Sequence, residues 1–236
     1  MFDKSKITNI FWDLDHTLWD YPTNARLTVF ELFEKYKLNE LTKHKPEVFH
    51  NTYCHHNDAA WDDYRDGKID KQTLRKLRFS KTFTELGIEN EKFHEIFENE
   101  FVEKCPTKGN LMSGALEMLR FFEKDYKQHI ITNGFKETQE IKLKTSGIFH
   151  FFSTITNSED VGVQKPNPQI FKSALSAAAT FAENSLMVGD NFEADILGAY
   201  NLGFNCIFFN HDSKKIENIP KEIVELNDLN DVKNYF

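Results

Sequence analysis

Two aspartates lie two positions apart, directly after an apolar run near the start of the chain, in the segment FWDLDHTLWD. Side chains at positions i and i+2 of an extended segment point the same way, so Asp13 and Asp15 can face one pocket. Two neighbouring carboxylates repel each other unless a cation or a proton separates them. One aspartate here could be a turn residue, but two of them followed by Thr17 indicate a site that holds a cation.

Further polar side chains follow other apolar runs of the sequence. Thr132 and Asn133 follow HIIT, Lys165 lies in a loop beyond STIT, and Asp190 follows SLMVG with Asp195 shortly after it. In an open parallel sheet, ligands bind at the edge formed by the carboxyl ends of the strands. These side chains can therefore converge with the first two aspartates on one site.

The residue types in this set suit a divalent cation and a phosphate group. Asp190 would bring the number of carboxyl groups to three, and hard oxygen ligands of this kind favour Mg²⁺. Lys165 would neutralise a phosphoryl oxygen. The Thr132 hydroxyl and the Asn133 backbone N–H would bind another phosphoryl oxygen.

Strand-like and helix-like segments alternate along most of the chain. The strand-like runs are short and rich in β-branched and aromatic residues, and they cover 7–14, 129–132, 153–156, 185–189 and 206–209. Segments with helical spacing of apolar residues lie between them, at 113–125, 136–147, 167–181 and 193–203. The alternation predicts an α/β fold with a doubly wound parallel sheet.

One long segment interrupts this alternation. Residues 20–108 contain many helix formers and no strand-like run, so we expect an inserted α-helical domain. The α/β core would then consist of residues 1–19 and 109–236. The tail from 212 onward is interpreted as a solvated segment with at most a final short strand or helix and no functional role.

Composition and charge narrow the class of protein. A net charge of −8 among 236 residues argues against a surface for a nucleic-acid polymer or an anionic membrane. The three cysteines are far apart and show no metal-binding spacing, which fits a reduced compartment. No stretch approaches the roughly 20 apolar residues of a membrane span, and no signal peptide is evident. We expect a cytoplasmic protein, monomeric or weakly dimeric.

Four segments resemble, in order, the motifs of the haloacid dehalogenase superfamily: DLDHT, HIITNG, VQKPNPQIF and GDNFEAD. The helical insert resembles the C1-type cap of that superfamily. Sequence segments such as YRDGKIDKQTLRKLRF and ITNGFKETQ are similar to those of the YjjG-like branch. The members of this branch are nucleoside 5′-monophosphatases with a preference for noncanonical pyrimidine nucleotides. Many members have glycine at the position of His16. The histidine could alter the hinge after the first strand, and its side chain could contact the leaving group.

The resemblance implies a role for each aspartate. Asp13 would be the nucleophile and form an aspartyl-phosphate. Asp15 would protonate the leaving oxygen and then activate water. Asp13, the backbone carbonyl of Asp15, and Asp190 would ligate Mg²⁺. Asp195 would orient this set through water or Lys165 rather than bind the ion directly.

The same resemblance gives the remaining polar residues a part in holding the phosphoryl group. Thr132, Asn133 and Lys165 would bind the group during in-line transfer. Each also has a plainer structural interpretation: Thr132 could be a helix N-cap, and Lys165 a solvated loop residue.

Residues of the helical insert carry weaker hypotheses. Four could contact a base or a sugar, although aromatic residues at helical spacing more often form a core: Trp61, Tyr64, Arg75 and Arg78. His55 and His56 are adjacent, and adjacent helical side chains point apart, so a metal site there is not expected.

The sequence thus predicts a Mg²⁺-dependent phosphomonoesterase of small phosphorylated metabolites, with nucleoside 5′-monophosphates as the expected substrates on resemblance. The alternatives are a phosphatase of small sugar phosphates or phosphoglycolate, a sugar-phosphate mutase, a 2-haloacid dehalogenase, and a non-catalytic phosphometabolite-binding protein. Asp15 argues against the dehalogenase, since that reaction has no ester oxygen to protonate.

Overall fold

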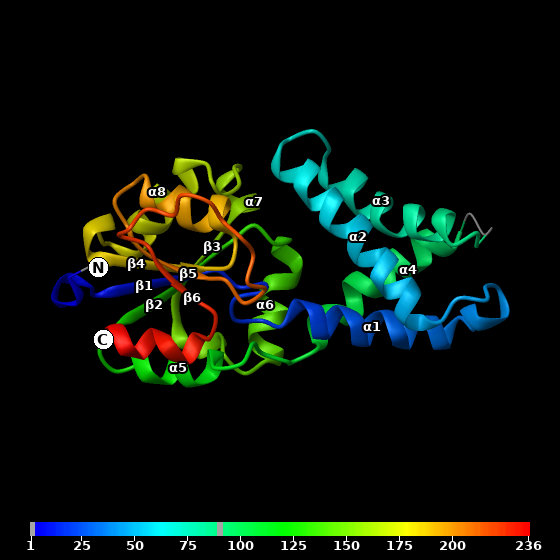
Figure 1. Cartoon of the computed structure of the whole chain (residues 1–236), viewed down its shortest axis with the longest axis horizontal. Coiled ribbons are helices and arrows are strands. Elements are labelled where there is room, and N and C mark those ends of the chain that lie inside the picture. Colours follow the sequence, from blue (N-terminus) through cyan, green and yellow to red (C-terminus); the bar gives the residue numbers. More distant parts are fainter. Residues whose placement is uncertain (1–2, 89–91) are drawn as a thin grey trace. The chain divides into compact units, whose positions relative to one another are not determined.

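The computed structural model describes residues 3–88 and 92–236, and the chain divides into two compact units (Figure 1). One unit comprises the chain up to Tyr21 together with Gly109–Phe236, and the other comprises Pro22–Lys108. The second boundary, between residues 108 and 109, lies where the sequence predicts it. The first boundary lies between residues 21 and 22, two residues after the predicted one between 19 and 20. Within the described residues, no helix is long and apolar enough to cross a membrane.

The first unit contains a six-stranded parallel sheet. Its strands are β1 (Asn9–Trp12), β2 (Lys127–Thr132), β3 (Phe152–Asn157), β4 (Ser185–Gly189), β5 (Asn205–Phe209) and β6 (Val224–Leu226). Their spatial order is β3-β2-β1-β4-β5-β6, and every pairing is parallel. The predicted doubly wound parallel sheet is confirmed. Each of the five predicted apolar runs overlaps one strand, and β6 is a sixth strand in the tail.

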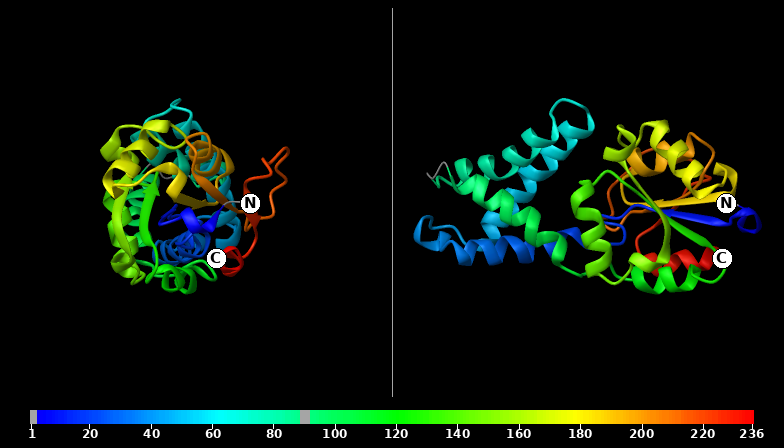
Figure 2. Two further views of the ribbon diagram at one scale, coloured as in Figure 1. Left: turned by 90° about the vertical axis from the view of Figure 1, so that its left-hand side faces the viewer. Right: turned by 180° about the vertical axis from the view of Figure 1, so that it is seen from behind.

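Helices cover both faces of the sheet, as the view from behind in Figure 2 also shows. The helices of this unit are α5 (Ala115–Phe122), α6 (Lys136–Thr145), α7 (Ser158–Val161), α8 (Pro168–Ala178), a π-helix (Phe192–Leu197) that continues into α9 (Gly198–Tyr200), and a C-terminal 3-10 helix (Leu229–Tyr235). Helix α5 and the C-terminal 3-10 helix contact each other on one side, and α8 and α9 contact each other on the opposite side.

The alternation of side chains along β1 explains this layering. Phe11 packs with Ile131, Phe171 and Met187 in the core beneath α8 and α9. Trp12 points to the other face, where its ring lies 6.1 Å from that of Phe122 in α5. Because both faces of the central strands are buried, the strands appear in the sequence as continuous apolar runs.

The second unit is helical, with α1 (Tyr21–Lys35), α2 (Pro46–Arg65), α3 (Lys71–Glu85) and α4 (Phe93–Lys104). Further 3-10 turns in the chain cover Lys4–Lys6, Leu38–Glu40, Cys105–Thr107, Phe149–Phe151 and Ala182–Asn184. Aromatic side chains form the centre of the helical unit, including Phe49, Tyr53, Phe79 and Phe97, which are fully buried. Residues 90–91, at the start of the segment predicted to form the last insert helix, lie outside the described residues.

The arginines proposed for substrate contact are engaged inside the helical unit. Arg78 is buried and its guanidinium donates two hydrogen bonds of 2.8 Å to Glu98. Arg75 donates to the same carboxylate at 2.9 Å. Trp61 and Tyr64 pack edge to face with ring centroids 5.7 Å apart. These contacts give all four residues a structural role within the helices.

Candidate active site

A buried lysine links two aspartates at the carboxyl edge of the sheet. Asp13 directly follows β1, and its backbone N–H donates to the carbonyl of Val188 in β4. The Lys165 ammonium lies 2.5 Å from Asp13 Oδ1 and 2.6 Å from Asp195 Oδ1, and donates to the Ile131 carbonyl at 2.8 Å. Lys165 is only 2% exposed, so the alternative interpretation of Lys165 as a solvated loop residue is wrong.

Asp190 completes a group of three carboxylates. Oxygen atoms of Asp13, Asp190 and Asp195 all lie within 4.8 Å of one another. Asp190 follows β4 and accepts a hydrogen bond from the Thr17 hydroxyl at 3.3 Å. Asp195 lies in the π-helix, where its Oδ2 accepts from the Asn191 backbone N–H at 3.0 Å.

Gly189, the last residue of β4, makes room for this arrangement. A Cβ atom at this position would lie 2.5 Å from Oδ2 and 2.6 Å from Cβ of Asp195. Glycine at this position, which has no side chain, allows a neighbouring group to approach the backbone closely. In the structure, the group that approaches it is the Asp195 side chain.

The electrostatics of the site favour a bound cation. Burial raises the pKa of Asp13 well above its usual range, with Lys165 opposing the shift and Asp195 and Asp190 adding to it. Burial and the neighbouring Asp195 carboxylate raise the pKa of Asp190 to about 7. Burial lowers the pKa of Lys165, but Asp13 and Asp195 together raise it overall, so the lysine stays charged. Three acids beside one cation leave excess negative charge, which a divalent ion with hard-oxygen preference would balance.

Asn133 holds the loop that carries Lys165. Its side-chain amide donates to the Lys165 carbonyl at 3.0 Å and accepts from the Lys165 backbone N–H at 2.8 Å. This side-chain role was absent from the sequence prediction, which assigned only the Asn133 backbone N–H to phosphate binding. The paired hydrogen bonds fix the start of the lysine side chain relative to the end of β2.

Thr132, the last residue of β2, is buried at the same edge. Its hydroxyl accepts from the Gly134 backbone N–H at 3.0 Å and lies 3.3 Å from Gln139 Oε1. The N-cap residue of the following helix is Phe135, so Thr132 is not that cap. Phosphate binding by the Thr132 hydroxyl stays a prediction.

Asp15 is not one of the three grouped carboxylates. Its side chain forms an ion pair with Lys142, a lysine that the sequence did not predict at the site. The Lys142 ammonium lies 2.6 and 2.8 Å from the two carboxylate oxygens of Asp15. It also sits 4.6 Å from the centre of the Trp19 ring. The buried residues of α6 are Thr138, Gln139, Lys142 and Leu143. Lys142 therefore lies on the buried face of the helix, although a lysine among charged residues is usually exposed to solvent.

His16 occupies the place where many superfamily members have glycine. Its backbone φ is +66°, in the left-handed region, and its N–H donates to the Trp19 carbonyl at 2.9 Å. A residue without a Cβ adopts this conformation with least strain, which explains a glycine at this point of the turn. The chain tolerates histidine here, and Asp13 still reaches the site.

Known proteins resemble the chain over most of its length. The model of the haloacid dehalogenase-like hydrolase family matches residues 10–209. The chain is 34% identical over 212 residues to pyrimidine 5′-nucleotidase YjjG of Escherichia coli, covering 89% of each protein. It is 30% identical over 203 residues to pyrimidine 5′-nucleotidase PynA of Streptococcus pneumoniae, covering 85% of this chain and 83% of that protein.

A solved structure shows the same architecture. The HAD-hydrolase YfnB of Bacillus subtilis, solved with bound magnesium and described as revealing interdomain movement, superimposes with a TM-score of 0.86 at 26% identity. The match covers 97% of this chain and 98% of YfnB. The family model spans most of the chain, and both relatives match over more than four fifths of their own length, so the chain belongs to the haloacid dehalogenase-like hydrolase family and is a hydrolase.

Proposed function

We propose that this protein is a Mg²⁺-dependent phosphomonoesterase that acts through an aspartyl-phosphate, with nucleoside 5′-monophosphates, pyrimidine nucleotides first among them, as substrates. The observation that carries the proposal is the buried Lys165 between Asp13 and Asp195, with Asp190 beside them. Such a site offers a nucleophilic carboxylate, a cation for phosphoryl oxygens, and oxygen ligands for a metal.

Asp13 would attack the phosphorus atom and displace the nucleoside 5′-oxygen. Its position after β1 puts the carboxylate at the edge where ligands of parallel sheets bind. Lys165 restrains the Asp13 carboxylate and would neutralise charge on the transferring group. Asp195 and Asn133 position Lys165 from two sides, so each acts through the lysine rather than on the phosphoryl group. Thr132 and the Asn133 backbone N–H would hold a second phosphoryl oxygen.

The donor set fits Mg²⁺. Asp13, Asp190 and the backbone carbonyl of Asp15 would hold the ion, with Asp195 as a supporting carboxylate nearby. When bound, Mg²⁺ would offset the repulsion between the carboxylates and the substrate phosphate and polarise the phosphoryl group. The structure of YfnB with bound magnesium supports this choice of metal.

Asp15 would donate a proton to the leaving 5′-oxygen and then accept one from the water that hydrolyses the aspartyl-phosphate. Lys142 contacts both of its carboxylate oxygens and would fix the direction in which the carboxyl group points. This second aspartate separates the proposed reaction from dehalogenation at carbon, where no ester oxygen needs a proton.

The choice of substrate rests on two relatives named pyrimidine 5′-nucleotidases that match over most of their length. The helical unit of residues 22–108 would serve as a cap that selects the nucleoside. The interdomain movement described for YfnB supports a cap that opens and closes around substrate in this protein too. We propose a monomer or weak dimer that acts in the cytoplasm, without nucleic-acid polymer or membrane partners.

The test is phosphate release from a panel of nucleoside 5′-monophosphates and small sugar phosphates, with Mg²⁺ and after its removal by chelation. We expect pyrimidine nucleotides to give the highest kcat/KM, and activity to disappear without Mg²⁺ and in Asp13→Asn. Sugar phosphates that outperform every nucleotide would refute the substrate class. Activity that persists in Asp13→Asn would refute the nucleophile.

A further inference from the structure

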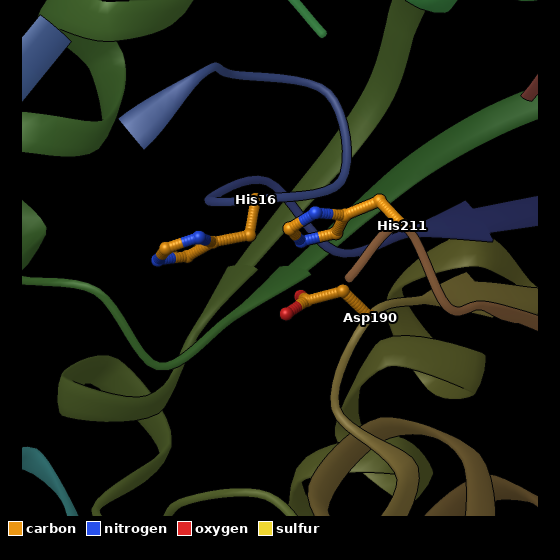
Figure 3. Close-up of side chains that lie close together, drawn as sticks. All are labelled: His16, Asp190 and His211. Atoms are coloured by element: carbon orange, nitrogen blue, oxygen red, sulfur yellow. The ribbon is translucent and has the colours of Figure 1, made fainter. Parts of the chain in front are cut away.

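Two histidines and one aspartate gather at the carboxyl ends of three neighbouring strands. His16 follows β1, Asp190 follows β4 and His211 follows β5, and these strands are adjacent in the sheet. One donor atom from each of the three residues lies within 4.8 Å of the others. Figure 3 shows both imidazole rings beside the Asp190 carboxylate. We propose that His16, Asp190 and His211 form a transition-metal site that binds Zn²⁺.

The donor chemistry of this trio differs from that of the three carboxylates. Imidazole nitrogen is a ligand for Zn²⁺, Co²⁺, Ni²⁺ and Cu²⁺, whereas Mg²⁺ takes oxygen ligands. Two histidines and one carboxylate, with the remaining position left to water or substrate, are a ligand set that open zinc sites use. The trio is therefore selective for a borderline metal, although it shares Asp190 with the magnesium ligands proposed above.

The surroundings of His211 match those of a metal ligand. Its Nδ1 lies 2.8 Å from Asp212 Oδ1, which leaves Nε2 as the nitrogen for the metal. A ligating histidine commonly donates its other ring N–H to a carboxylate in this way, which fixes the ring and its tautomer. The Thr17 hydroxyl likewise donates to Asp190 at 3.3 Å and restrains the carboxylate.

The three donor atoms have to move only slightly closer together to bind one ion. Zinc bonds to nitrogen and oxygen measure about 2.0–2.2 Å, so neighbouring donors on one tetrahedral ion lie roughly 3.4 Å apart. The rings of His16 and His211 are nearly parallel, with an interplanar angle of 12° and centroids 6.2 Å apart. The donors, which lie within 4.8 Å of one another, would have to approach by at most about 1.4 Å, and we expect side-chain rotations to supply this.

The test uses the metal alone and the whole 236-residue chain, so it does not depend on phosphatase activity. Co²⁺ is added to metal-free protein and its visible absorption is followed, and Zn²⁺ binding is measured by calorimetry. We expect one Co²⁺ per chain with the spectrum of imidazole ligation. We expect His211→Ala to weaken Zn²⁺ binding more than 100-fold, and Asp212→Asn to weaken it roughly 10- to 100-fold through loss of the ring's carboxylate partner.

A matched control is His150→Ala, which removes an exposed histidine of the same unit and should leave Zn²⁺ affinity unchanged. Thermal melts of each variant check the fold, and the exposed Asp212 offers a substitution that leaves the ligands themselves in place. Zn²⁺ binding of equal strength in wild type, His16→Ala and His211→Ala would refute the site. A Co²⁺ spectrum of all-oxygen ligation would refute it as well, because it would put the ion among the three carboxylates.

Discussion

Replacing Lys142 with methionine removes the cation that contacts both carboxylate oxygens of Asp15 and keeps most of the side chain's apolar volume. Lys142 and Asp15 side chains are 8% and 22% exposed, and the ammonium also rests on the Trp19 ring. If the role of this lysine is to aim the Asp15 carboxyl group at the leaving oxygen, its loss affects the step that needs a proton donor. Esters with good leaving groups should be spared, because they depart without protonation.

The expected size of the effect follows from the contact. A hydrogen bond to a charged group contributes about 1.5–3 kcal/mol. If that energy is lost from the transition state, kcat/KM for a nucleoside 5′-monophosphate falls by roughly 10- to 160-fold. For an aryl phosphate such as p-nitrophenyl phosphate, we expect a loss of less than about threefold. The quantity kcat/KM is the right one, since it reports the steps up to departure of the leaving group.

The control for this substitution is Lys144, two positions further along the same helix. Lys144 pairs with Glu140 at 2.5 Å, and both side chains are about 60% exposed, so Lys144→Met should leave both substrates within about twofold of wild type. Lys142→Arg, which keeps a bidentate cation, should recover most of the nucleotide activity. Equal losses for nucleotide and aryl phosphate in Lys142→Met would show that the lysine only supports the fold, and would refute a role in positioning Asp15.

Three further predictions concern the buried charges. Lys165→Met leaves the Asp13 and Asp195 carboxylates without their shared cation, so turnover should be lost and the free energy of unfolding in urea should fall by about 3–5 kcal/mol; a change under about 1 kcal/mol would contradict the buried ion pairs. Without Mg²⁺, the pKa of Asp190 is about 7 in the folded protein and near 3.8 in the unfolded chain, so the native state holds the extra proton and stability should fall as pH rises from about 4 to 7. Asp190→Asn should reduce this slope, to which Asp13, whose pKa burial also raises, contributes as well. Mg²⁺ affinity of the wild type should rise over the same interval because the ion displaces the proton; a slope that Asp190→Asn leaves unchanged would refute the assignment. Gly189→Ala should destabilise the protein by about 1–3 kcal/mol, since the new methyl group overlaps the Asp195 carboxylate; an unchanged urea midpoint would show that Asp195 moves aside freely.

The sequence predicts the strands that carry the site because they are buried on both faces. Their apolar runs are continuous, and the residue after each run marks the edge of the sheet, as for Asp13 and Asp190. The sixth strand, Val224–Leu226, has only three residues and one of them is Glu225. This strand pairs with β5 at the edge of the sheet. The pairing depends on the rest of the sheet, so the local sequence does not predict it.

The contacts between side chains of the site depend on tertiary structure. Lys142 lies on a helix rich in charged residues, where solvent exposure is the usual outcome for a lysine, and only packing of α6 against the core turns it toward Asp15. The sequence places Asn133 near the site but does not distinguish its backbone N–H from its side-chain amide. His211 approaches His16 across 195 positions of the chain because β5 lies beside β4, which in turn lies beside β1.

The measurement that tests the central claim most directly is a burst experiment with the Asp15→Asn variant and p-nitrophenyl phosphate in the presence of Mg²⁺. The aryl group leaves without a proton donor, while hydrolysis of the aspartyl-phosphate lacks its base, so the intermediate should accumulate. We predict a rapid release of about one equivalent of p-nitrophenolate per chain, with a base-labile phosphoryl group on Asp13. The double variant that also carries Asp13→Asn should show neither. A burst that survives in the double variant, or a phosphoryl group on another residue, would contradict Asp13 as the nucleophile.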